Sequence, residues 1–257
     1  GDDDQAIFKW AGADVDHFIA LKEEVNDIKV LDQSYRIPGG PIHELSQNII
    51  NKVQNRFDKD YKPRDDEGIL KRYSDITQVD MSKGNWLVLS SANYFLDDAK
   101  DLCEIQGWYY QFKGRNSIPL KLLMALNNWE AWRKDAQLNH LEIKNIYEYL
   151  GSHVLPGFQK GKTLHSDTKY LMRDCRAEHG LVTDSVWYEA FEGLDPMTET
   201  YIRNMRANGE MINKNPRIIM STIHGAKGGE ADKVLLMQDI TNAALETFSH
   251  DPDELHR

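Results

Sequence analysis

Short apolar runs rich in β-branched residues alternate along the chain with longer segments of helical periodicity. Four such runs predict strands, at 28–31, 86–90, 217–222 and 234–237. Unbroken apolar runs are typical of strands buried on both faces of a parallel sheet. Apolar residues recur at helical spacing over 41–57 and 94–106, and the second segment ends at Gly107. The pattern therefore predicts an α/β fold with a parallel sheet.

Residues 113–212 have a different pattern. Helical periodicity dominates there, over 120–132, 141–150 and 169–179, and strand signals are weak. The charge changes as well: this interval carries 13 basic and 13 acidic residues, whereas the rest of the chain carries 18 basic and 28 acidic residues. Both changes indicate a mainly helical subdomain inserted into an α/β chain.

The composition is that of a globular protein, with 40% hydrophobic and 28% charged residues. A net charge of −10 argues against a protein that coats nucleic acid electrostatically. No apolar run approaches the roughly 18 residues of a membrane span, and the acidic start leads us to expect no signal peptide. Cys103 and Cys175 lack disulfide or metal-site spacing and are expected to be free thiols. We therefore expect a cytoplasmic protein of bacterial or phage-type intracellular origin, with no membrane partner.

The first segment with candidate chemistry is the acidic start, residues 1–13, which reads GDDDQAIFKWAGA. The amide of Gln5 could sense a phosphate or orient a water, and the rings of Phe8 and Trp10 could stack on bases. The alternative is an acidic loop before a helix whose aromatic residues belong to the core.

The second segment, residues 31–38, reads LDQSYRIP. Arg36 could place a guanidinium on a phosphate, and the neighbouring Tyr35 could place its ring on a base. The alternative is an exposed loop arginine beside a packed tyrosine.

The third segment, residues 221–230, reads STIHGAKGGE and directly follows an apolar run. Its glycines, Gly228 among them, let backbone N–H groups approach an anion closely. Glu230 could accept a hydrogen bond from a ribose hydroxyl. The segment lacks the spacing of a Walker A loop, and the alternative is a glycine-rich turn from strand to helix.

Taken together and in this order, the three segments resemble helicase motifs III, IV and V of the UvrD/Rep/PcrA-like superfamily-one DNA helicases. The resemblance lies in GDxxQxI-aromatic-xWxGA, LxxxYR and TIHxAKGxE. Residues 253–257, DELHR, resemble the opening of motif VI, and residues 107–114 are similar to the segment at the edge of the family's inserted 2B domain. Departures from the family pattern are Ala11 in place of the usual Arg, and Gly229 and Ala231 in place of the usual Leu and Phe.

The resemblance implies a RecA-like fold of the P-loop NTPase type with a mainly helical inserted subdomain. Residues 1–28 are then expected to be the tail of the first RecA-like domain, 1A. Residues 29–112 and 213–257 are expected to form the second RecA-like domain, 2A. Residues 113–212 are expected to be a 2B-like helical insertion.

The resemblance also implies roles for individual residues. Gln5 and Arg36 are expected at the γ-phosphate of ATP and are the candidate catalytic residues. At the rest of the nucleotide, Tyr35 is expected on adenine, Glu230 on the ribose and Gly228 in the binding loop. Candidate DNA-binding residues are Phe8 and Trp10 on the bases, with Thr222 and His224 on the backbone.

The implied activity is that of an ATP-dependent DNA helicase, which translocates on single-stranded DNA and unwinds duplexes at single-strand/double-strand junctions, with 3′–5′ travel. The expected cofactors are ATP and Mg²⁺, but the 257 residues contain no Walker A loop and no Asp-Glu pair for Mg²⁺. The chain is therefore expected to supply half of an ATP site, with the first RecA-like domain as its partner. Two alternatives remain: a non-catalytic module that binds single-stranded DNA or docks a partner, or the helicase portion of a RecB/AddA-type helicase-nuclease.

Other candidate sites are weaker. His153, His165 and His179 are too scattered for a metal site, so no metal ligand is predicted. The acidic runs at 65–67 and 97–98 are interpreted as solvated charge. Basic residues between 160 and 176 could contact a nucleic-acid backbone, but acidic residues interleave with them.

Overall fold

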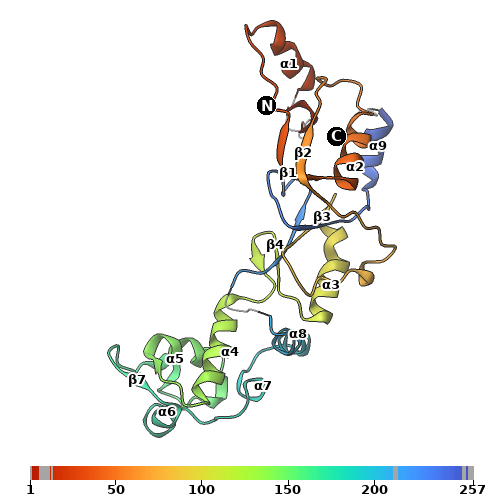
Figure 1. Cartoon of the computed structure of the whole chain (residues 1–257). Coiled ribbons are helices and arrows are strands. Elements are labelled where there is room, and N and C mark those ends of the chain that lie inside the picture. The colour runs from red at the N-terminus through yellow and green to blue at the C-terminus, as the bar shows by residue number, and fades with distance from the viewer. Residues whose placement is uncertain (1, 6–11, 13, 211–213, 251–252, 254–257) are drawn as a thin grey trace.

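The computed structural model describes residues 2–5, 12, 14–210, 214–250 and 253. The molecule is elongated, with its N-terminal elements near one end and a cluster of helices at the other (Figure 1). Among the described residues, no helix has the length and apolar character needed to cross a membrane.

A five-stranded sheet lies in the middle of the molecule, with the strand order β5-β4-β8-β3-β9. Neighbouring strands are parallel except for β5, which runs antiparallel to β4. Val88 pairs in register with Met220 on one side and Leu235 on the other. The structure thus confirms a mixed α/β fold with a mostly parallel sheet. The strands are β3 (Trp86–Ser90), β4 (Tyr110–Phe112), β5 (Arg115–Asn116), β8 (Ile218–Thr222) and β9 (Lys233–Leu236).

Helices α3 (Asp97–Gln106) and α8 (Pro196–Ala207) pack on this sheet and on each other. Helix α3 ends, as predicted, at Gly107, which has a φ of 68° in the left-handed region. A Cβ atom on Gly107 would lie 2.4 Å from the backbone carbon of Asn204 in α8. Glycine is therefore required here both for the helix end and for the close approach of α8.

A second, smaller sheet carries the segment around Tyr35. Strand β1 (Gln33–Gly39) pairs in parallel with β2 (Lys62–Glu67), and α2 (Pro41–Ile50) connects them. The strand predicted at 28–31 is wrong, because the ladder with β2 begins only at Gln33 and the side chain of Leu31 is 81% exposed. Helix α2 also ends at Ile50, before the predicted end at 57. Two further helices flank this region, α1 (Val15–Ala20) and α9 (Asn242–His250).

The helical cluster at the far end is built around tryptophans. Trp129 and Trp132 of α4 are fully buried, and their indole N–H groups donate to the carbonyls of Ser185 and Tyr170, both at 3.0 Å. These bonds satisfy the polar edge of each ring inside the core. The elements are α4 (Leu120–Trp132), α5 (His140–Tyr147), α6 (Met172–Glu178), α7 (Trp187–Ala190) and the short antiparallel strands β6 (Leu138–Asn139) and β7 (Lys169–Tyr170).

The projecting helical unit is smaller than the predicted interval 113–212. Strand β5 belongs to the central sheet, joined to β4 by a turn at Lys113 and Gly114 with φ values of 50° and 73°. Helix α8 packs on α3, and the Tyr201 hydroxyl donates to the carbonyl of Trp108 at 2.8 Å. The part that stands apart from the sheet is therefore α4 to α7, because β5 and α8 complete the α/β part.

Candidate functional site

The third segment leaves the central sheet at the carboxyl ends of its parallel strands. Thr222 pairs with Ser90, and the N–H of Ile223 donates to the Ser90 carbonyl at 2.9 Å. The Thr222 hydroxyl accepts from the N–H of Gly225 at 3.1 Å, and Gly228 has a φ of 84°. Ligands of open α/β sheets bind at this edge, so the loop after β8 stands where a ligand is expected.

Arg36 and Glu230 come together although they are far apart in the sequence. The Nε atom of Arg36 lies 3.1 Å from Oε2 of Glu230, and the two side chains are 57% and 72% exposed. This ion pair joins the second candidate segment to the third. An exposed pair of this kind contributes about 0–1 kcal/mol, so either side chain can exchange its partner for a ligand at little cost.

The backbone beneath Arg36 is fixed more firmly than its side chain. Ser34 is buried, and its hydroxyl accepts from the N–H groups of Arg36 at 3.2 Å and Ile37 at 2.9 Å. Tyr35 is 85% exposed. Strand β1 therefore presents a ring and a guanidinium to solvent from a hydrogen-bonded backbone.

Lys227 connects the third candidate segment to the first. Its Nζ atom donates to the backbone carbonyl of Gln5 at 2.8 Å. Gln5 ends a one-turn 3₁₀ helix, η1 (Asp3–Gln5), and its N–H donates to the carbonyl of Asp2 at 3.2 Å. The third segment thus contacts both the second segment, through Glu230, and the first, through Lys227.

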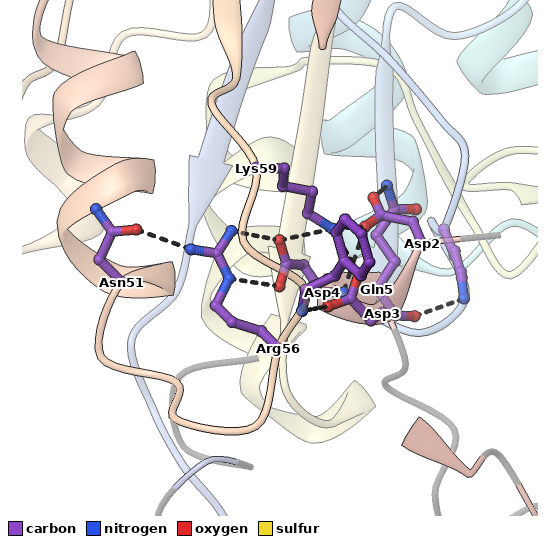
Figure 2. Close-up of polar contacts among 9 residues, drawn as sticks. Asp2, Asp3, Asp4, Gln5, Asn51, Arg56 and Lys59 are labelled. Atoms are coloured by element: carbon purple, nitrogen blue, oxygen red, sulfur yellow. Dashed lines mark hydrogen bonds and ion pairs between the residues drawn. The ribbon is translucent and has the colours of Figure 1, made fainter. Parts of the chain in front are cut away.

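A cluster of ion pairs surrounds Gln5 (Figure 2). The Nζ atom of Lys59 lies 2.6 Å from carboxylate oxygens of Asp2 and Asp3 and 3.0 Å from one of Asp4. Arg56 binds both oxygens of Asp4, through Nε at 3.1 Å and Nη2 at 2.9 Å. The cluster fastens residues 2–5 to the segment that follows α2.

The charges in this cluster support one another. Burial of Asp3 opposes its ionisation, but hydrogen bonds from the Lys59 ammonium and the Phe57 N–H outweigh burial and lower the pKa of Asp3. Burial likewise opposes the charge of Lys59, yet hydrogen bonds to the three carboxylates raise its pKa. The pKa of Arg56 is raised chiefly by its hydrogen bond to Asp4. All three groups are therefore charged at neutral pH.

The three carboxylates are close enough to share a cation, since one ligand atom from each lies within 4.8 Å of the others. Lys59 and Arg56 already supply their positive charge. The cluster is consequently explained as an ion-pair network that requires no metal.

A cavity of about 720 Å³ opens beside the cluster. Acidic residues 2–4 and Gln5 line one part of it, and apolar side chains such as Val25, Ile28 and Ile50 line another. The cavity lies between the N-terminal segment and the β1–α2 unit. It places the side chains of the first candidate segment beside an accessible space.

Some predicted site residues take no part in the contacts described above. Phe8, Trp10 and Ala11 lie outside the described residues, as do 254–257 of the segment similar to motif VI. Thr222, the last residue of β8, is half-buried, and His224, in the loop that follows, is exposed. Sequence reasoning missed Arg56 and Lys59, which lie more than fifty residues from the acids at 2–4, and it gave Lys227 of the third segment no role of its own.

The sequence matches no protein-family model, and a search of curated proteins also gives no match. The functional assignment therefore depends on the motif resemblance together with the contacts described above.

Proposed function

We propose that this chain is the C-terminal motor half of a UvrD-like, ATP-dependent DNA helicase with a RecA-like second domain. The observation that carries the proposal is the meeting of the three motif-like segments through two contacts. Arg36 pairs with Glu230, and Lys227 binds the carbonyl of Gln5. Arg36 and Glu230, which resemble nucleotide ligands of one family, are thus in contact, and the loop that carries Glu230 also binds the backbone of Gln5.

The proposed chemistry uses residues from this chain on one side of the nucleotide. Arg36 leaves Glu230 and binds the γ-phosphate, where its planar, permanently charged guanidinium stabilises negative charge. Glu230 then accepts a ribose hydroxyl, and the exposed ring of Tyr35 packs on adenine. Gln5 orients the attacking water or contacts the γ-phosphate.

The remaining ATP-binding groups come, in this proposal, from a first RecA-like domain. Its Walker A lysine and Asp-Glu pair hold the phosphates and Mg²⁺, which neutralises charge in the transition state. Single-stranded DNA follows Thr222 and His224 along its backbone and stacks on Phe8 and Trp10. Cleft closure then moves the protein along the strand and unwinds duplex at a junction.

Two substitutions in the complete two-domain motor test the nucleotide-binding part and the DNA-binding part of the proposal separately. Arg36→Ala removes transition-state stabilisation and is expected to lower kcat by on the order of 10³-fold, with single-strand affinity retained. Arg36→Lys does not restore turnover, because an ammonium lacks the bidentate fork. Trp10→Ala is expected to weaken single-strand binding about 5- to 150-fold, with ATP affinity retained.

The two measurements are steady-state ATP turnover and fluorescence anisotropy of labelled single-stranded DNA. Normal ATP hydrolysis by Arg36→Ala contradicts the nucleotide assignment. Unchanged DNA affinity in Trp10→Ala contradicts the DNA assignment.

A further inference from the structure

Lys59 reaches Gln5 through the carboxylate of Asp2, and this connection gives the lysine a role beyond holding the chain together. We propose that Lys59 is a positioning residue that fixes the side-chain amide of Gln5 through Asp2. The inference rests on the proposed function, in which Gln5 acts on the γ-phosphate or the attacking water.

The geometry of Asp2 links the two side chains directly (Figure 2). One carboxylate oxygen, Oδ2, accepts a hydrogen bond from Nε2 of Gln5 at 2.7 Å. The other oxygen, Oδ1, accepts from Nζ of Lys59 at 2.6 Å. The carboxylate is therefore held on both sides, and its orientation determines that of the Gln5 amide.

The hydrogen bond to Asp2 selects one of the two orientations of the Gln5 amide. An ionised carboxylate can only accept hydrogen bonds, so the NH₂ group of Gln5 must face Asp2. This leaves the carbonyl oxygen Oε1 and the second N–H of the amide for a ligand. A water oriented for attack donates to such a carbonyl oxygen, and a phosphate oxygen accepts from such an N–H.

Lys59 is itself fixed, which a positioning residue requires. Its side chain is 15% exposed and also contacts Asp3, whose side chain is 2% exposed, and Asp4. Arg56 holds Asp4 through two hydrogen bonds and donates to Oδ1 of Asn51 at 2.8 Å. The network of hydrogen bonds and ion pairs therefore extends from the end of α2 to Gln5. Lys227 also binds the backbone carbonyl of Gln5.

The test compares Asp2→Asn with Asp4→Asn in the complete motor. Both substitutions remove one negative charge from the same cluster, but only Asp2 contacts the side chain of Gln5. Asp2→Asn is expected to lower kcat up to about 100-fold, the loss typical of a misplaced catalytic group, with a smaller change in KM for ATP. Asp4→Asn is expected to lower the melting temperature more and kcat less, because Asp4 is the bidentate partner of Arg56.

Lys59 is tested by rescue. Lys59→Met is expected to lower kcat as Asp2→Asn does, and Lys59→Arg is expected to restore most of it. An effect on melting temperature alone, equal for Met and Arg, overturns the proposal. Equal kcat losses for Asp2→Asn and Asp4→Asn also overturn it.

A spectroscopic readout on the 257-residue chain keeps this inference separate from the helicase assignment. The side-chain amide resonances of Gln5 are expected to move in Asp2→Asn and Lys59→Met and to remain near their wild-type positions in Lys59→Arg. If they do not move, the positioning contact is refuted whatever the function. If they move but Gln5→Ala hydrolyses ATP normally in the complete motor, the proposed role of Gln5 fails while the contact stands.

Discussion

Lys59 and Arg36 show how differently two ion pairs can serve one site. Lys59 is largely buried among three carboxylates, and removing it would leave the buried carboxylate of Asp3 without its positive partner. Arg36 and Glu230 are more than half exposed, and water screens their attraction. The first arrangement holds residues 2–5 in place. The second leaves both side chains available to exchange partners, as binding of a charged ligand requires.

The pH dependence of stability is predicted from Asp3 and Lys59. The pKa of Asp3 is lowered on folding, so its contribution is present above the unfolded value of about 3.9 and lost as pH falls through the folded value. The pKa of Lys59 is raised, so its contribution is present below about 10.4 and lost as pH rises through the folded value. Between these limits the cluster is expected to stay intact.

Urea unfolding at pH 3 and pH 7 measures how much stability is lost at acid pH. The loss of unfolding free energy between pH 7 and pH 3 is expected to be smaller in Asp3→Asn than in the wild type. Asp98→Asn is the control, because Asp98 is exposed in the first turn of α3 and belongs to no part of this cluster. An acid sensitivity in Asp3→Asn equal to that of the wild type would contradict the assignment.

Most of the elements that the sequence predicted bury apolar side chains, whereas β9, also predicted, leaves Val234 and Leu236 about half exposed. Strands β3, β8 and β9 lie within one residue of their predicted ranges at every end, and α4 matches 120–132. Strands β1 and β2 were missed, because their stability comes from ladder hydrogen bonds. Strand β2 reads KPRDDE, which carries no apolar periodicity. Hydrophobic pattern cannot locate a strand whose neighbours, and not its own side chains, determine its position.

Gly107 and Gly114 provide a test of how tightly α8 packs against the end of α3. Both have positive φ values, 68° and 73°, but only Gly107 has α8 against its Cα; nothing lies within 4 Å of a Cβ built on Gly114. Gly114→Ala is expected to cost the left-handed strain alone, about 1–3 kcal/mol. Gly107→Ala is expected to cost more, because the added methyl also displaces the backbone of α8. Urea denaturation of both variants measures the difference in unfolding free energy. Equal losses would show that α8 can move away from the added methyl group without cost.

At the scale of the whole molecule, the candidate site is made by contacts that no local pattern contains. The resemblance to helicase motifs selected Gln5, Arg36 and Glu230, and the fold brings their segments together through Glu230 and Lys227. The same resemblance could not find Lys59 and Arg56, because their importance comes from facing residues 2–4 across the cavity edge. The helical unit α4 to α7 lies far from this site (Figure 1). Under the proposed function, it can act on that chemistry only through the sheet or through bound DNA.

The last prediction follows from which parts of the proposed ATP site the chain could supply. Phosphoryl transfer needs a phosphate cradle, a metal and charge-stabilising side chains together, and the sequence has no Walker A loop and no Asp-Glu pair expected to bind Mg²⁺. The purified chain is therefore expected to show no DNA-stimulated ATP hydrolysis by itself. Addition of a RecA-like domain with a Walker A loop, covalently or in trans, is expected to produce turnover that Arg36→Ala abolishes. The control is a Walker A lysine variant of the added domain, which must be inactive with the wild-type chain. Hydrolysis by the chain alone, with that activity retained after Arg36→Ala, would show that the nucleotide is bound and cleaved elsewhere in this molecule.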